Sequence, residues 1–228
     1  MFKFAPAMKC KNCNVENTCI KKGFYKNTQR WYCKTCKSYQ QQSYVYLMCT
    51  SYHEEMILKL NNEGVGISGI SRITGVSKAN VINKIKLLAS RVTLPDFKET
   101  DQEYEVDELY TYVRRKDCSC YVIYALNKKS KQIMDFFVGN RTKGNINRVI
   151  TSILFHNPKR IFTDKLNVYP SLIEKSKHIA TCYQINHIER FNLTLRTHLK
   201  RLSRKTICYS KSKYMLECSL KLYFWRTS

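Results

Sequence analysis

Four cysteines in two closely spaced pairs are the first residues whose types and spacing could support chemistry. Cys10 and Cys13 form one CxxC pair, and Cys33 and Cys36 form a second pair after 19 intervening residues. Two such pairs allow four thiolates to converge on one tetrahedral Zn²⁺ ion, with a short hairpin between them. Because so few residues cannot build an adequate core, the metal would supply much of the folding free energy. A redox function or a chance spacing is the alternative interpretation.

Three carboxylates in the second half of the chain form the other candidate site. Asp107 lies within a predicted strand, Asp164 ends another strand, and Glu189 opens a predicted helix. If the strands are neighbours and the helix packs across the sheet, the three carboxylates converge, which bound divalent cations would make tolerable. Two Mg²⁺ ions about 4 Å apart would then activate a water or hydroxyl and stabilise the leaving oxygen of a phosphodiester. Taken singly, each acid also fits an acidic loop, a turn or a helix start.

The elements that must position these acids alternate between strand and helix. Strands are predicted over 104–113, 121–130, 131–140, 160–164 and 179–183, and helical segments over 143–155, 168–177 and 187–205. This order favours a mixed α/β sheet covered by helices on both faces.

The middle of the chain carries a helix-turn-helix pattern, preceded by a predicted helix over 52–63. Apolar residues repeat at helical spacing over 67–73 and again over 81–88, and Gly75 and Ser77 lie between the two runs. Gly75 suits a left-handed turn, and Ser77 is a good cap for the second helix. The early residues of that helix are candidates for contacting bases or phosphates: Ser77, Lys78, Asn80, Asn83 and Lys84. An ordinary helical hairpin is the alternative.

The charge of the chain points to a polyanionic partner. Lys and Arg number 40 against 17 Asp and Glu, which gives a formal charge of +23. A protein with this excess is suited to nucleic acid or an anionic surface. Since no apolar run approaches the roughly 18 residues of a membrane span and the start lacks a signal-peptide core, we expect a cytoplasmic, nucleoid-associated protein. The hydrophobic fraction of 43% excludes a wholly disordered basic tail.

Basic residues also follow the third acid. On a helical wheel, Arg196 and Lys200 fall within about 20° of Glu189. The residues predicted to grip DNA phosphates beside the metal site are Arg190, Arg196, Lys200, Arg201, Arg204 and Lys205.

Several stretches together resemble the transposases of the insertion-sequence-1 family. They are the two CxxC pairs, GVGISGISRITGVS, EVDELYTYV, FTDKLNVY and IERFNLTLRTHLKRLSRKTICYSKS. The resemblance implies a zinc-binding module, a helix-turn-helix that recognises terminal inverted repeats, and a ribonuclease-H-like catalytic domain of the DDE type. Carried over by motif, the catalytic acids are Asp107, Asp164 and Glu189, and Arg196 matches the basic position after the glutamate.

The sequence therefore predicts a transposase with three parts. A zinc-ribbon-like module spans 1–45, a helix-turn-helix domain spans 50–95, and a catalytic domain spans 100–228. We expect structural Zn²⁺, catalytic Mg²⁺ or Mn²⁺, double-stranded DNA as terminal repeats and target, a homo-oligomer on DNA, and no membrane. The alternatives are a non-catalytic DNA-binding regulator, a nuclease or resolvase of the same fold, and an inactive transposase remnant.

Overall fold

The chain forms two compact units, Met1–Cys49 and Thr50–Ser228. The structure is a computed structural model that describes residues 8–25, 27–41, 51–95, 97, 99–181 and 183–225. Residues 1–7, 26 and 42–45 of the predicted zinc module lie outside these ranges. No helix in the described ranges is both long and apolar enough to cross a membrane.

The first unit is a small antiparallel sheet. Its strands are β1 (Cys19–Tyr25), β2 (Thr28–Cys33) and β3 (Tyr39–Gln41), in the order β1-β2-β3. The segment between the cysteine pairs therefore forms the predicted hairpin. Its buried apolar side chains are few, with Trp31 and the cysteines Cys10 and Cys33 as its buried members. So small a core needs a further source of stability.

The second unit begins with three helices, α1 (Ser51–Asn62), α2 (Ile67–Thr74) and α3 (Lys78–Ser90). The turn between α2 and α3 has the predicted chemistry. Gly75 ends α2 in the left-handed region at φ 71°, and the Ser77 hydroxyl caps α3 by accepting a hydrogen bond from the Asn80 amide at 3.3 Å. Ile70 on α2 packs into the interior with Val81 and Ile85 on α3, all of them buried.

A five-stranded mixed sheet follows the three helices. It contains β4 (Glu103–Val113), β5 (Arg115–Asn127), β6 (Ile133–Gly139), β7 (Arg160–Thr163) and β8 (His178–Ala180), in the order β6-β5-β4-β7-β8. The pairs β4–β5 and β5–β6 are antiparallel, whereas β4–β7 and β7–β8 are parallel. The predicted α/β sheet is thus present, with its first strand at the centre.

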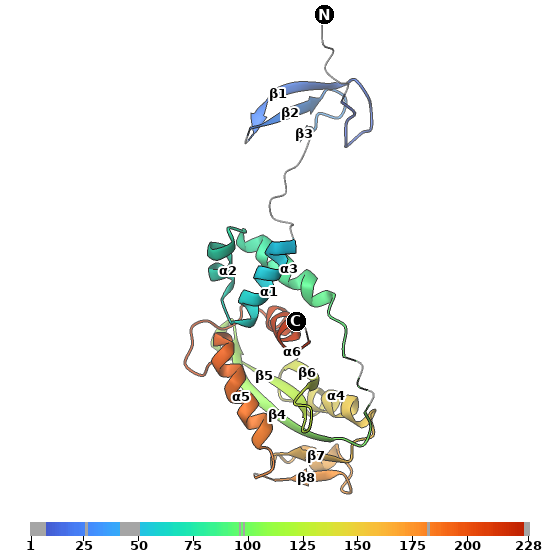
Figure 1. Ribbon diagram of the computed structural model, residues 1–228, viewed down its shortest axis with the longest axis vertical. Coiled ribbons are helices and arrows are strands. Elements are labelled where there is room, and N and C mark those ends of the chain that lie inside the picture. The colour runs from blue at the N-terminus through green and yellow to red at the C-terminus, as the bar shows by residue number, and fades with distance from the viewer. Residues whose placement is uncertain are drawn as a thin grey trace, which may run out of the picture. The chain divides into compact units, whose positions relative to one another are not determined.

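Helices cover both faces of this sheet (Figure 1). Helix α4 (Lys143–Leu154) packs Ile146, Val149 and Ile150 against one face. Helices α5 (Asn186–His198) and α6 (Lys213–Trp225) build the core on the other face. Because α6 also contacts α1 and α3, the helix-turn-helix and the sheet belong to one compact unit.

The last predicted helix is shorter than expected. The segment predicted as one helix over 187–205 leaves the helical conformation at Leu199 (ψ 90°) and ends in a 3₁₀ turn, η2 (Lys200–Leu202). Leu199 and Leu202 are both buried, and the Arg196 guanidinium donates to the Leu202 carbonyl at 2.8 Å. Burial of these leucines favours the break, so the helical wheel does not place Lys200 beside Arg196.

Two other segments also differ from the prediction. The segment 168–177 forms only a 3₁₀ turn, η1 (Tyr169–Ser171), which contains Pro170. Helix α6 was not predicted, although Leu216, Leu220 and Tyr223 recur at helical spacing. The sequence prediction ended at the helical segment over 187–205 and did not extend to these residues.

Candidate metal centre and nucleic-acid interface

The strand register brings two of the predicted acids together. Val106 on β4 is the parallel partner of Thr163 on β7, so the next residues, Asp107 and Asp164, lie at the same level of the sheet. One carboxylate oxygen from each of Asp107, Glu108 and Asp164 lies within 4.8 Å of the others. Asp164 follows the last residue of β7. Ligands commonly bind at the carboxyl ends of parallel strands such as β7.

Asp107 is held by hydrogen bonds on both of its oxygens. Its Oδ2 accepts from the Asn192 side-chain amide at 2.7 Å, and its Oδ1 accepts from the Glu108 backbone amide at 2.7 Å. Burial raises the pKa of Asp107, and the negative charges of Asp164 and Glu189 raise it further. The two hydrogen bonds therefore orient the Asp107 side chain, and a nearby cation would stabilise its negative charge.

Glu108 is a site residue that the sequence analysis missed. The Tyr169 hydroxyl of η1 donates a hydrogen bond to its Oε1. Burial raises the pKa of Glu108 to about 7. Side chains alternate along a strand, so Asp107 and Glu108 leave β4 on opposite faces, but β7 ends at Thr163 and Asp164 lies within reach of both. Its position directly after Asp107 was the one available signal.

Glu189 lies apart from this group. It is exposed in the first turn of α5 and is not among the three acids whose oxygens come within 4.8 Å of one another. Its charge nevertheless acts on Asp107. The structure therefore brings Asp107 and Asp164 together and adds Glu108 to them, while the role of Glu189 stays a prediction.

The three clustered carboxylates fit a hard divalent cation. Mg²⁺ prefers oxygen ligands at about 2.1 Å and commonly takes one or two carboxylates together with waters. Oxygens within 4.8 Å of one another lie close enough to serve one such ion directly or through its bound waters. The raised pKa values of Asp107 and Glu108 show that the negative charges are costly here without a cation.

The four cysteines of the first unit also converge. Cys10, Cys13, Cys33 and Cys36 each offer a sulfur within 4.8 Å of the others. The Sγ atoms are 3.6 Å apart in the pair Cys10–Cys36 and 3.7 Å apart in the pair Cys13–Cys33. Tetrahedral Zn²⁺ with bonds of about 2.3 Å has sulfur–sulfur edges of about 3.8 Å. The geometry of the cluster therefore fits zinc.

The thiols of this cluster differ in acidity. The Cys36 backbone amide, with the Thr18 hydroxyl, lowers the pKa of Cys33 to about 5. Although the Val15 backbone amide opposes the change, burial and the neighbouring cysteines raise the pKa of Cys13 to about 12. Four adjacent thiolates need a cation, which is what a structural metal supplies.

The predicted residues of the helix-turn-helix divide into two groups. Lys78, Asn80 and Asn83 are exposed on α3, and Ser77 is exposed while its hydroxyl caps the helix. Lys84 instead forms an ion pair with Glu54 of α1. The ammonium group of Lys84 thus links two helices of the motif.

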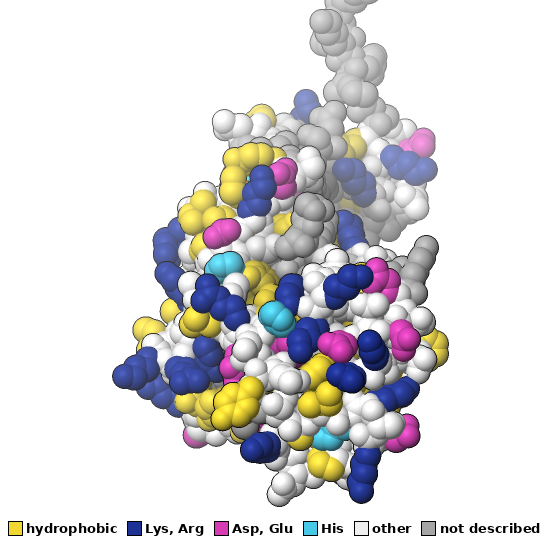
Figure 2. Space-filling view, turned by 60° about the horizontal axis from the view of Figure 1, so that its bottom comes forward, with side chains coloured by type: hydrophobic (Ala, Val, Ile, Leu, Met, Phe, Trp, Pro, Cys, Tyr) yellow, Lys and Arg dark blue, Asp and Glu magenta, His cyan; other side chains and the backbone are white. Residues whose placement is uncertain are grey.

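The predicted phosphate-gripping residues divide in the same way. Arg190, Lys200, Arg204 and Lys205 are exposed. Lys and Arg side chains recur across the face shown in Figure 2. Arg196 is half-buried, and its guanidinium donates to the carbonyl oxygens of Leu202 and Tyr110 at 2.8 and 3.2 Å.

Arg201 departs from the expectation. It is 8% exposed, and its guanidinium donates to the hydroxyls of Ser219 and Ser210 at 2.9 and 3.4 Å. The break at Leu199 turns Arg201 inward toward α6, because its neighbour Leu202 enters the core. We therefore leave Arg201 out of the proposed DNA-contacting residues.

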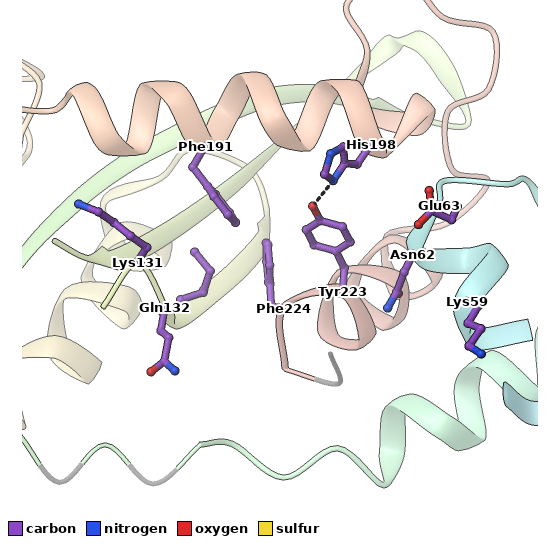
Figure 3. Close-up of a pocket in the computed structure, with 10 residues that line it drawn as sticks. Lys59, Asn62, Glu63, Lys131, Gln132, Phe191, His198, Tyr223 and Phe224 are labelled. Carbon is purple, nitrogen blue, oxygen red and sulfur yellow. Dashed lines mark hydrogen bonds between the residues drawn. The ribbon is translucent and has the colours of Figure 1, made fainter. Parts of the chain in front are cut away.

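A cavity of about 590 Å³ lies away from the clustered carboxylates, between α1, the β5–β6 turn, α5 and α6. Phe191 and Phe224 line it, and His198 Nδ1 lies 2.7 Å from the Tyr223 hydroxyl (Figure 3). None of the three clustered acids lines this cavity, so it is separate from the candidate metal centre.

Comparison with known proteins identifies the family. The model of the IS1 transposase family matches residues 103–225, which include all three clustered acids, Glu189, and every strand of the mixed sheet. This match spans more than half of the chain, and the chain therefore belongs to the IS1 transposase family.

Several insertion-element proteins are similar to about half of the chain. The iso-IS1n protein InsB of Shigella dysenteriae is 34% identical over 108 residues, which are 47% of this chain and 82% of that protein. The IS1 4 protein InsB of Escherichia coli K12 is 32% identical over 108 residues, which are 65% of its length. A simian T-cell lymphotropic virus intasome in complex with a PP2A regulatory subunit contains a chain with TM-score 0.39 and 15% identity, covering 73% of this chain and 67% of that one.

Proposed function

We propose that this chain is an Mg²⁺-dependent DNA transposase that cuts DNA at the ends of an insertion element and joins them to target DNA. The observation that carries the proposal is the pairing of Asp107 with Asp164 at the end of β7. The sheet order β6-β5-β4-β7-β8, with three antiparallel strands followed by two parallel ones, supports a ribonuclease-H-like fold.

Asp107 and Asp164 would hold the metal, with Glu108 and Glu189 as the two further acids at the site. When bound, Mg²⁺ lowers the pKa of the attacking water and stabilises the developing negative charge on the phosphate. Asn192 orients Asp107, and Tyr169 orients Glu108, so that these oxygens are fixed before DNA arrives. Because these side chains are already in place, fewer polar groups have to reorient during the reaction.

Two displacements at phosphorus make up the proposed reaction. In the first, water attacks the phosphodiester at the element's end, the bond to the 3′ oxygen breaks, and the end keeps a 3′-hydroxyl. In the second, that hydroxyl attacks a target phosphodiester, forms a new phosphorus–oxygen bond and displaces a target 3′ oxygen. The exposed side chains of Arg190, Lys200, Arg204 and Lys205 would hold the DNA backbone during both steps.

The amino-terminal parts would select the DNA. We assign recognition of the terminal inverted repeats to a zinc-ribbon-like module over 1–45 and a helix-turn-helix domain over 50–95, and the chemistry to residues 100–228. Lys78, Asn80 and Asn83 are exposed early in α3, the helix that would enter the major groove. Since two ends must be joined, we expect a homo-oligomer on DNA, acting at the nucleoid.

The test incubates purified full-length protein with labelled terminal-repeat DNA and a target plasmid, in Mg²⁺ or in EDTA. Wild type is compared with Asp107→Asn, Asp164→Asn and Glu103→Gln, a control on β4. We expect joined products only in Mg²⁺, retained with Glu103→Gln and reduced by about 100-fold or more with either aspartate variant.

Unchanged joining by the aspartate variants would refute the metal assignment. End binding without cleavage by wild type would indicate a non-catalytic regulator or an inactive remnant. Cleavage without joined products would indicate a nuclease or resolvase.

A further inference from the structure

Glu105 is a buried carboxylate on β4 that the proposed chemistry does not use. It is 0% exposed and precedes Asp107 by two positions, so both side chains lie on the sheet face that α5 covers. Its Oε2 accepts a hydrogen bond from the Ile188 backbone amide at 2.7 Å. Its Oε1 has no hydrogen-bond partner among the described residues. Burial of a carboxylate costs free energy unless specific interactions compensate for the lost water.

The start of α5 lacks a cap of its own. The residue before the helix is Ile185, whose side chain cannot accept a hydrogen bond. The first backbone bond of the helix runs from the Glu189 amide to the Ile185 carbonyl at 3.1 Å, so the Ile188 amide precedes the first helical bond. Glu105 therefore supplies, from another element, the acceptor that a capping side chain normally provides. Its negative charge also suits the positive end of the helix dipole.

A second set of bonds ties α5 to the sheet one turn further on. Asn192 donates to Asp107 at 2.7 Å, and the Tyr124 hydroxyl of β5 donates to Asn192 Oδ1 at 2.8 Å. Glu189 lies between the two attachments, directly after Ile188 and three residues before Asn192. The two attachments thus bracket the exposed acid of the helix.

Apolar packing alone would not fix the helix in this way. Ile188 and Leu195 hold α5 against the sheet, but contacts between apolar side chains are non-directional and tolerate small displacements along the helix axis. A hydrogen bond to the first turn has a preferred direction and length. It therefore sets where along the axis the helix begins.

We propose that Glu105 is a positioning residue that caps α5 from β4 and thereby fixes Glu189 relative to Asp107. The positioning of Glu189 for catalysis rests on the proposed transposase function, whereas the capping of α5 does not. Glu105 itself would touch neither DNA nor metal.

The experiment compares full-length wild type with Glu105→Met, Glu105→Gln and Glu103→Gln. Methionine is close to glutamate in volume but offers no comparable acceptor, whereas the glutamine amide oxygen can accept from Ile188. Glu103 lies on the same strand, and its side chain makes no hydrogen bond to α5 among the described residues, so its variant is the control. Hydrogen exchange by mass spectrometry follows peptides of α5, Mn²⁺ titration measures the metal site, and the DNA assay measures cleavage.

We expect Glu105→Met to raise the exchange rate at the start of α5 by about tenfold, as loss of one hydrogen bond predicts. It should also weaken Mn²⁺ binding and reduce cleavage, while Glu105→Gln and Glu103→Gln stay near wild type. If Glu105 only stabilised the fold, Glu105→Met would lower the melting temperature. At temperatures where both variants are folded, Glu105→Met and Glu105→Gln would then bind Mn²⁺ with the same affinity.

Wild-type exchange and Mn²⁺ affinity in a folded Glu105→Met variant would overturn the proposal. If that variant does not fold, residue-resolved exchange of the wild type decides, because an Ile188 amide that exchanges as fast as the neighbouring His187 amide would overturn the capping role. Exchange is measured without DNA. Failure of wild type to cleave would therefore count against the transposase activity, while the exchange data would still decide whether Glu105 caps α5.

Discussion

The side-chain amide of Asn192 donates a hydrogen bond to Oδ2 of Asp107 at 2.7 Å and so joins α5 to the central strand at the candidate metal centre. The Tyr124 hydroxyl fixes the other end of the same amide at 2.8 Å. A carboxylate held in this way presents its remaining lone pairs in a fixed direction. The contact therefore couples the position of a helix to the orientation of a metal ligand.

Asn192→Ala should therefore reduce both stability and DNA cleavage. Loss of a hydrogen bond to a charged group costs about 1.5–3 kcal/mol, and we expect cleavage to fall by about 10–100-fold. Thr197→Ala is the matched control, since among the described residues the Thr197 hydroxyl bonds only to the Leu193 carbonyl of its own helix, at 2.9 Å. Equal cleavage by the two variants, measured with labelled end DNA, would contradict a role for Asn192.

The stability of the metal-free protein should fall as pH rises toward 7. Burial raises the pKa of Glu108 to about 7 from 4.5, so between these values the folded protein keeps a proton that the unfolded chain has released. The contribution of Glu108 to the free energy of unfolding is fully present below its pKa in the unfolded chain. It is lost as the pH rises through its pKa in the folded protein, which lowers the free energy of unfolding by about 3 kcal/mol. Thermal unfolding in EDTA between pH 4.5 and 8 measures this trend, and Glu108→Gln should flatten it. Equal slopes for both proteins would contradict it.

Removal of zinc should unfold the first unit. We expect one Zn²⁺ per chain, and we expect protease sensitivity within residues 8–41 after chelation, because the unit has few other buried groups. Cys10→Ser should lose the metal. Cys19→Ser should retain it, since Cys19 is outside the four-cysteine group. Zinc content after dialysis tests the assignment, and loss of zinc from the Cys19 variant would show a different ligand set.

Exposed and buried basic residues should affect DNA binding differently. Arg204→Ala and Lys205→Ala should weaken binding, and each should reduce the slope of log K against log salt by about 1. Arg201→Met should leave the slope unchanged, because Arg201 is buried against Ser219. Binding isotherms at several salt concentrations measure this difference, and a reduced slope for Arg201→Met would place that residue at the DNA.

Gly64 should be required for docking of the first helix onto α5. Its φ of +69° is unfavourable for other residues, and a Cβ atom there would collide with the His198 carbonyl oxygen. We expect Gly64→Ala to destabilise the protein by about 2 kcal/mol or more. Gly66→Ala is the control, because a Cβ at Gly66 meets no atom within 4 Å. Similar melting temperatures for the two variants would contradict this expectation.

Features that depend on short-range spacing were predictable from the sequence. The CxxC pairs, the Gly75–Ser77 turn and the strand pattern around Asp107 depend on local periodicity and on residues close in the chain. The end of α5 was not predictable in this way, because the helical spacing of the leucines continues past His198. The burial of Leu199 and Leu202 in the core overrides local helix preference there.

The sequence by itself determined the cysteine cluster, the helix-turn-helix, the alternating α/β order and the candidacy of Asp107 and Asp164. Tertiary structure decided that Glu108 joins these two acids, that Arg201 is buried, and that Glu105 and Asn192 hold α5. The physical reason is that strand register and packing bring together residues far apart in the chain. A carboxylate's burial and partners come from those distant neighbours, and its own position in the sequence does not reveal them.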